Sequence, residues 1–250
     1  MHPDFIIPDW PAAANVRALV TTRTLPGASV APFHAFNLGA YCGDAPQAVR
    51  ENRRRLIELA NLPSSPHWLK QVHGIEVLRF DAPPAPDAVA MEADAAVTST
   101  SGVVLCVQTA DCLPVLLASR YGDEVAVAHA GWRGLANGVL EATLAAMRSA
   151  PADVIAWLGP AAGPQRYEIG AEVRAAFIAR DAHAARHFSA TRENHWRIDL
   201  FALARDGLAR AGVRQVYGGG ICTLSEAARF YSYRRDGRTG RQAALTWIAC

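Results

Sequence analysis

Residues 103–130 read VVLCVQTADCLPVLLASRYGDEVAVAHA, three apolar runs separated by short polar segments. The first run, 103–109, favours a buried strand that breaks at the TADC sequence. The runs LPVLLAS (113–119) and EVAVAHA (124–130) favour two further strands joined by a turn at residues 121–123. This stretch therefore predicts a core built on strands, and each break leaves a polar side chain at a strand end.

Outward from this core, helical and strand patterns alternate without a visible repeat. Helices are predicted at 46–61, with Asp44 as cap and Pro46 in the first turn, and at 135–150, 172–183 and 199–211. Strands are predicted at 18–24, 95–98, 154–160 and 213–216, in a strand–turn–strand over 67–80, and in a pair around the loop 235–240. Strands outnumber helices, and many connections resemble hairpins. We therefore predict one domain, residues 1–250, with an α+β fold of layered mixed sheets and outer helices.

Composition narrows the class of protein. Hydrophobic residues make up 51% of the chain and charged residues 19%, which predicts a packed core rather than disorder. The net charge is +2 without long runs of one sign, so we expect no nucleic-acid partner. No signal peptide and no apolar run of membrane-spanning length is visible. The five cysteines lack paired spacing, which favours a reducing cytoplasm.

Three side chains at strand ends or turns are able to bind a metal: His73 in QVHG, Cys112 in TADC and His129 in AHAGWRG. Each alone is more often structural, since a lone histidine is usually just hydrogen-bonded and a buried cysteine usually packs as an apolar residue. Together, two imidazoles and one thiolate suit zinc and leave a fourth position open for catalysis. Copper is also compatible with these ligands.

Other polar residues lie close to these in sequence. Arg133 is one helical turn past His129 if a helix begins there, and it is a candidate for catalysis and for binding phosphate or a substrate hydroxyl; a surface salt bridge is the equal alternative. Asn37, Arg53 and Gln71 are candidate substrate contacts. Asp111 neighbours Cys112, but a structural role is favoured there. No phosphate-loop, dinucleotide or nucleophile-elbow motif is present.

The sequence resembles the bacterial YfiH/laccase-domain family over nearly the whole chain. The motifs that carry the resemblance are PFHAFNLG, GDAPQAVRENRRRL, WLKQVHG, ADAAVTST, QTADCLPVLL, AHAGWRG, LGPAAGPQRYEIGAEV, GGGICT and FYSYRRDGRTGR. The family was long labelled multicopper polyphenol oxidoreductase and is now regarded as purine nucleoside phosphorylase. One departure is TTRTLPGAS, where the family commonly has two glycines after the arginine.

The resemblance implies a zinc site at His73, Cys112 and His129, the same three residues that chemistry selects. It implies phosphorolysis of adenosine, inosine, guanosine and S-methyl-5′-thioadenosine, with adenosine deaminase activity. The implied fold is an α/β/β/α layered single domain, usually monomeric, and purine nucleosides and phosphate are its expected partners. Composition predicts a cytoplasmic location and no nucleic-acid or membrane partner.

Three other functions remain open. Cys112 would be the nucleophile and His129 its base in a cysteine amidohydrolase that edits peptidoglycan precursors. A copper-dependent phenol oxidase is a second alternative, although the chain has few histidines for a multicopper cluster. A non-enzymatic module that stores or senses metal is the third.

Overall fold

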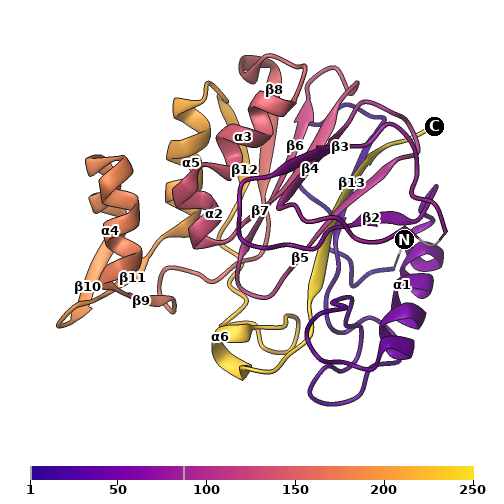
Figure 1. The fold of residues 1–250 in the computed structure, drawn as a ribbon, viewed down its shortest axis with the longest axis horizontal. Coiled ribbons are helices and arrows are strands. Elements are labelled where there is room, and N and C mark those ends of the chain that lie inside the picture. The colour runs from indigo at the N-terminus through magenta and orange to yellow at the C-terminus, as the bar shows by residue number, and fades with distance from the viewer. Residues whose placement is uncertain (1, 87) are drawn as a thin grey trace.

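The computed structural model describes residues 2–86 and 88–250, and within them the strands form three sheets flanked by helices (Figure 1). The first sheet has four strands in the order β1 (Val16–Val20), β13 (Gln242–Ile248), β5 (Val104–Thr109), β2 (Pro66–Trp68). β13 is antiparallel to both β1 and β5, whereas β2 runs parallel to β5. The strand predicted at 18–24 thus begins and ends earlier than expected.

The second sheet has six strands. Their order is β12 (Gln215–Gly218), β8 (Val154–Leu158), β6 (Leu113–Ser119), β7 (Val125–Ala130), β4 (Ala95–Thr98), β3 (Val77–Arg79). The central four strands are antiparallel, and a parallel strand closes each edge. β6 and β7 are fully buried and pair in register, Val115 opposite Ala128, which confirms the strand pair predicted from residues 113–130.

Alternation along the buried strands divides the apolar side chains into three layers. Leu105 of β5 packs with Leu116 of β6 between the two large sheets. Cys106 faces the other way, into the layer beneath helix α1 (Pro46–Ala60), while Val115 faces the helices on the far side of the six-stranded sheet. The predicted α/β/β/α layering is confirmed, with α1 on one side and α2, α3 and α5 on the other (Figure 1).

Helix α1 was predicted correctly, but its cap was not. Ala45 is the N-cap residue and no side chain caps the helix. Asp44 instead accepts hydrogen bonds from the Ser29 hydroxyl at 2.6 Å and the Asn37 amide at 2.9 Å. Its carboxylate therefore ties the preceding loop together.

The single helix predicted at 135–150 is two helices, α2 (Trp132–Asn137) and α3 (Val139–Ala146). Gly138 separates them with φ of +99°, a left-handed conformation that glycine adopts at little cost. Arg180 packs against Gly138, and a Cβ there would lie 2.5 Å from its guanidinium. The break therefore serves the packing of another helix, which no periodicity in this segment indicates.

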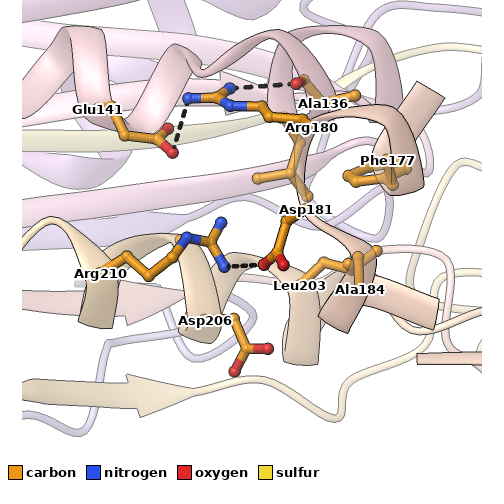
Figure 2. A pocket seen from close by; sticks show the side chains of 11 residues that line it. Ala136, Glu141, Phe177, Arg180, Asp181, Ala184, Leu203, Asp206 and Arg210 are labelled. Atoms are coloured by element: carbon orange, nitrogen blue, oxygen red, sulfur yellow. Dashed lines mark hydrogen bonds and ion pairs between the residues drawn. The ribbon is translucent and has the colours of Figure 1, made fainter. Parts of the chain in front are cut away.

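A third, small sheet was not predicted. It contains β10 (Phe188–Arg192), β11 (His195–Ile198) and β9 (Glu168–Gly170) and lies beside α4 (Ala171–Arg180), on the left in Figure 1. Arg180 of α4 pairs with Glu141 of α3, and Arg210 of α5 (Leu200–Arg210) pairs with Asp181, around a cavity of about 20 Å³ (Figure 2). That volume holds one water at most, so this is a helix-packing contact.

Of the strand pair predicted around residues 235–240, the second strand is present as β13, but the first strand is wrong. The segment before β13 is a short helix, α6 (Tyr233–Asp236), which the Ser232 side chain caps at the N-terminus. A buried glutamine explains why no strand forms: the Gln242 amide bonds both backbone groups of Tyr231 and holds that segment away from the sheet. α6 is thereby placed beside the β5–β6 turn.

Two connections pass from the four-stranded sheet to the six-stranded one at the same end of the molecule. The strand–turn–strand predicted over 67–80 is one of them, since β2 and β3 belong to different sheets. The turn between β5 and β6 is the other. In the part of the chain that the structure describes, no helix has the length and apolar character that a membrane span needs.

Candidate metal centre

The two connections and the end of β7 bring three predicted side chains together. His73 lies between β2 and β3, Cys112 precedes β6, and His129 is in β7. Their donor atoms all lie within 4.8 Å of one another, and Cys112 Sγ is 3.7 Å from His73 Nε2. Residues far apart in sequence therefore meet at one sheet-to-sheet junction, as predicted.

A buried aspartate positions both histidines. Asp94, directly before β4, accepts a hydrogen bond from His129 Nδ1 at 2.7 Å. Its carboxylate also accepts from the backbone N–H groups of Val72, His73 and Gly74, at 2.7–3.1 Å. Because Nδ1 of His129 donates to a carboxylate, Nε2 is the nitrogen that would bind a metal after losing its proton. His73 has φ of +62°, so these backbone contacts also hold a conformation that histidine rarely adopts.

A second aspartate supports Cys112. Asp111 accepts from the hydroxyls of Thr223 (2.6 Å) and Ser232 (3.0 Å) and from the backbone N–H of Arg234 (2.7 Å). Its own φ is +91°, which turns the chain sharply before Cys112. The structural role predicted for Asp111 is therefore the one observed, and it fixes the turn that presents the thiol.

Gly131 lies against the ligands. A Cβ at this position would be 2.9 Å from both Cys112 Sγ and the His73 ring. Any side chain here would therefore displace two of the three donor groups. This close approach explains why the chain turns into α2 through a glycine directly after β7.

Charge favours the metal-binding form of the thiol. Burial opposes ionisation of Cys112, but the charge on His129 and hydrogen bonds from both histidines outweigh it and lower its pKa to about 6. Burial likewise opposes the charged form of His129, but Cys112 and Asp94 outweigh it and raise the pKa to about 9. Burial would raise the pKa of Asp94, yet its hydrogen bonds keep that pKa below the usual value.

The three ligands face an open cavity of about 530 Å³. Its lining residues are Gly39, Tyr41, Cys42, Leu69, Gln71, His73, Gln108, Thr109, Ala110, Cys112, His129, Arg133, Tyr233 and Arg241. Two arginines are among them, and none of these described residues is acidic. Arg133 lies in the first turn of α2, as expected, with its guanidinium 4.2 Å from the Trp132 ring.

The candidate substrate contacts are not all in this cavity. Gln71 lines it, but its amide bonds the backbone N–H and carbonyl of Gln108 at 2.8 and 2.7 Å. Asn37 is fully buried and braces the segment around Gly39 and Arg241. Arg53 donates to the Leu38 carbonyl and stacks on Trp68. The structure thus keeps Gln71 and Arg133 in the cavity wall, while Asn37 and Arg53 support the loop behind it.

Sequence reasoning missed Asp94. The signal was an acidic residue directly before the apolar strand AAVT, a place where a charge needs buried partners. It also gave no reason to select Gln108 and Thr109, which follow four apolar residues of β5.

The donor geometry fits a single zinc ion. Ligands about 2.0–2.3 Å from zinc in a tetrahedron lie roughly 3.5 Å apart, close to the 3.7 Å between His73 Nε2 and Cys112 Sγ. With three protein ligands, the fourth position faces the cavity. Fold and site together define a two-sheet layered protein with an open His–Cys–His centre.

The chain belongs to the family described as multi-copper polyphenol oxidoreductase laccase, which matches residues 17–249. It is 57% identical over 252 residues to a purine nucleoside phosphorylase of Xylella fastidiosa, covering 98% of this chain and 97% of that one. Purine nucleoside phosphorylase YfiH of Escherichia coli is 49% identical over 243 residues, with 97% and 98% covered.

Solved structures share the fold. A Neisseria meningitidis protein superposes with a TM-score of 0.92 at 45% identity, covering 99% of this chain and all of that one. YlmD from Geobacillus stearothermophilus superposes with a TM-score of 0.85 at 29% identity, covering 100% and 94%. The predicted family and fold are therefore confirmed.

Proposed function

We propose that this protein is a zinc-dependent purine nucleoside phosphorylase acting on adenosine, inosine, guanosine and S-methyl-5′-thioadenosine, with adenosine deaminase activity. One observation carries the proposal: a His–Cys–His set faces a cavity of about 530 Å³, and no fourth metal-binding side chain among the described residues closes it. Relatives named purine nucleoside phosphorylase at 49–57% identity support the reaction class.

In phosphorolysis a phosphate oxygen forms a bond to ribose C1′ while the bond from C1′ to the purine nitrogen breaks. The electron pair of that bond leaves with the base, which then takes a proton. Arg133 and Arg241 supply the positive charge that phosphate needs, and neither forms an ion pair with an acid within the described residues. Zinc bound at His73, Cys112 and His129 would supply Lewis-acid chemistry beside them.

Rigid ligands favour this chemistry. His129 and His73 are held by Asp94, and the turn before Cys112 is held by Asp111, so the donors need no rearrangement before substrate arrives. Preorganised groups stabilise charge in a transition state without a reorganisation cost. In the proposed reaction these residues hold the centre in place, while the arginines at the cavity wall bind the anion.

The experiment is a product screen on purified, zinc-loaded protein with each of the four nucleosides, with and without phosphate. We expect free base and a sugar 1-phosphate only when phosphate is present: ribose 1-phosphate from adenosine, inosine and guanosine, and 5-methylthioribose 1-phosphate from S-methyl-5′-thioadenosine. Adenosine should be converted to inosine in either case. Failure to release any base with phosphate would contradict the phosphorylase proposal. Zinc binding without any turnover would favour the metal-storage alternative.

The thiol–imidazole contacts give the cysteine amidohydrolase a specific observation in its favour. Against the effect of burial, the charge and hydrogen bond of His129, its base in that hypothesis, help to lower the pKa of Cys112 to about 6, and His73 Nε2 lies 3.7 Å from Sγ. Chelation separates the two functions. A nucleophilic thiol gains activity when zinc is removed, whereas the proposed phosphorylase loses it. For a multicopper oxidase, the described residues hold one group of potential ligands rather than several.

A further inference from the structure

Most polar groups around the cavity already have protein partners. His129 is bonded to Asp94, and Gln71 uses its amide on the backbone of Gln108. Cys42 donates to the Gly39 carbonyl. Such groups are positioned by the fold, and a substrate would have to compete with the protein for them.

Two neighbouring side chains at the end of β5 differ from these. Gln108 is 9% exposed and Thr109 is 2% exposed, and both line the cavity. Within residues 2–86 and 88–250, the Gln108 carboxamide has no side-chain hydrogen bond and the Thr109 hydroxyl is buried without any partner. Buried polar groups are nearly always hydrogen-bonded in native proteins, so the Thr109 hydroxyl is an exception. The Gln108 carboxamide is not among the buried unpartnered atoms, so its hydrogen-bonding capacity is open to a ligand in the cavity.

The chemistry of the pair narrows that ligand. A carboxamide offers a donor and an acceptor side by side, and a hydroxyl is both donor and acceptor. Adenine presents an N6–H donor beside the N1 acceptor, and a 6-oxopurine presents the O6 acceptor beside an N1–H donor. Rotating the Gln108 carboxamide by a half-turn exchanges the positions of its N–H donor and its carbonyl acceptor. The side chain can therefore match either purine edge. A carboxylate could not, and none of the described lining residues has one.

We propose that the Gln108 carboxamide binds the edge of the purine base, and that its two-way character lets one site accept both 6-amino- and 6-oxopurines. The Thr109 hydroxyl, on the opposite face of β5, bonds the nucleoside separately. This rests on the proposed function for the identity of the ligand. The charged arginines then serve phosphate, and the two neutral side chains serve the nucleoside.

Replacing the carboxamide by a carboxylate tests this directly. Glu at position 108 accepts two hydrogen bonds, from N1–H and N2–H of guanine, but opposes the N1 lone pair of adenine. We expect Gln108→Glu to raise the preference for guanine over adenine roughly ten- to a hundredfold. The measurement is the dissociation constant of zinc-loaded protein for 9-methyladenine and 9-methylguanine, which lack ribose and cannot be cleaved.

Two further variants keep the test interpretable. Gln108→Met is neutral and of similar length, and it should weaken both purines by similar factors. The exposed Gln47 on α1 provides the matched control, and Gln47→Glu should leave both constants unchanged. Zinc content and melting temperature are measured for every variant.

The outcomes separate the two proposals. An unchanged guanine-to-adenine preference in Gln108→Glu, or wild-type protein that binds neither purine, overturns this inference. A shifted preference in a protein that never releases base from nucleosides supports the inference and overturns only the phosphorylase proposal.

Discussion

Two walls of the cavity differ in how their polar groups are hydrogen-bonded. The ligand wall is formed by His73, Cys112 and His129, and the β5 wall is formed by Gln108 and Thr109. Behind the ligand wall, the carboxylates of Asp94 and Asp111 together accept seven hydrogen bonds from the surrounding chain. On the β5 wall, within the described residues, the Thr109 hydroxyl is buried without a partner and the Gln108 carboxamide forms no hydrogen bond. One wall is built to stay fixed and the other to be completed by a ligand.

This difference separates two tasks within one site. Metal ligands must hold their orientation before the ion arrives, and a supporting shell of hydrogen bonds does this. Groups that read a substrate must be free to pair with it, which costs some stability in the empty protein. The comparison therefore predicts that changes behind the ligand wall damage metal binding, whereas changes on the β5 wall damage substrate binding alone.

The largest expected effect is that of Asp94→Ala. It leaves the buried His129 Nδ1 and three backbone N–H groups without their acceptor. We expect zinc affinity to fall roughly ten- to a hundredfold and the free energy of unfolding to fall by about 3–5 kcal/mol. Competition titration with a chromogenic chelator measures the first, and denaturant unfolding the second.

Glu92, two residues before Asp94, provides the matched control, because it is exposed and its one ion pair within the described residues is with Lys70. Glu92→Ala should leave zinc affinity unchanged. If Asp94→Ala does not fold, Asp94→Asn preserves the shape while losing the negative charge. Wild-type zinc affinity in a folded Asp94 variant would show that the histidines do not depend on this carboxylate.

Arg133→Ala should have a smaller effect, confined to catalysis. Arg133 is exposed at the cavity wall and packs on Trp132, so its removal leaves the ligands in place. We expect the KM for phosphate to rise roughly tenfold or more through loss of a charge-assisted hydrogen bond, with zinc affinity unchanged. Steady-state kinetics at varied phosphate measures it.

Arg120 is a suitable control, since it also lies over a neighbouring aromatic ring, that of Tyr121, but away from the cavity. Arg120→Ala should behave as wild type. If Arg133→Ala left the turnover number and both Michaelis constants unchanged, Arg133 would have no role in binding substrate.

The smallest expected effect is that of Thr109→Val, and its direction is informative. Removing a buried hydroxyl that has no partner should leave the melting temperature unchanged or raise it slightly. The nucleoside KM should nevertheless rise roughly two- to tenfold, the value of one hydrogen bond. The control is Thr143→Val, where the hydroxyl bonds the Val139 carbonyl far from the cavity. Loss of stability without a change in KM would mean that Thr109 has a structural partner.

Much of the fold follows from local pattern. The pair β6 and β7 was predicted because its apolar runs are long and joined by an evident turn, and α1 because its apolar face is regular. The break at Gly138 and the helix before β13 were not predicted, since each depends on a distant contact, with Arg180 and with Gln242. The hydrophobic pattern of the sequence also does not show that β2 and β3 belong to different sheets, or that β5 and β6 do.

The site residues show the same contrast between what local sequence reveals and what depends on distant contacts. Metal-competent side chains are recognisable by residue type, so His73, Cys112 and His129 were found from sequence. Asp94 and the β5 wall were not, because their roles depend on which partners the fold supplies or withholds. Asn37 and Arg53 illustrate the converse: polar residues in short motifs, selected as substrate contacts, have their side chains engaged in holding the loop at Leu38 and Gly39.

The most direct test of the account compares wild-type protein with Cys112→Ala in one assay series: zinc content by elemental analysis, and phosphate-dependent release of purine base. The account predicts about one zinc per wild-type chain, with zinc and base release lost together in Cys112→Ala, and wild-type activity restored after chelation by adding zinc back. Wild-type protein that releases base at full rate after complete removal of metal would contradict it.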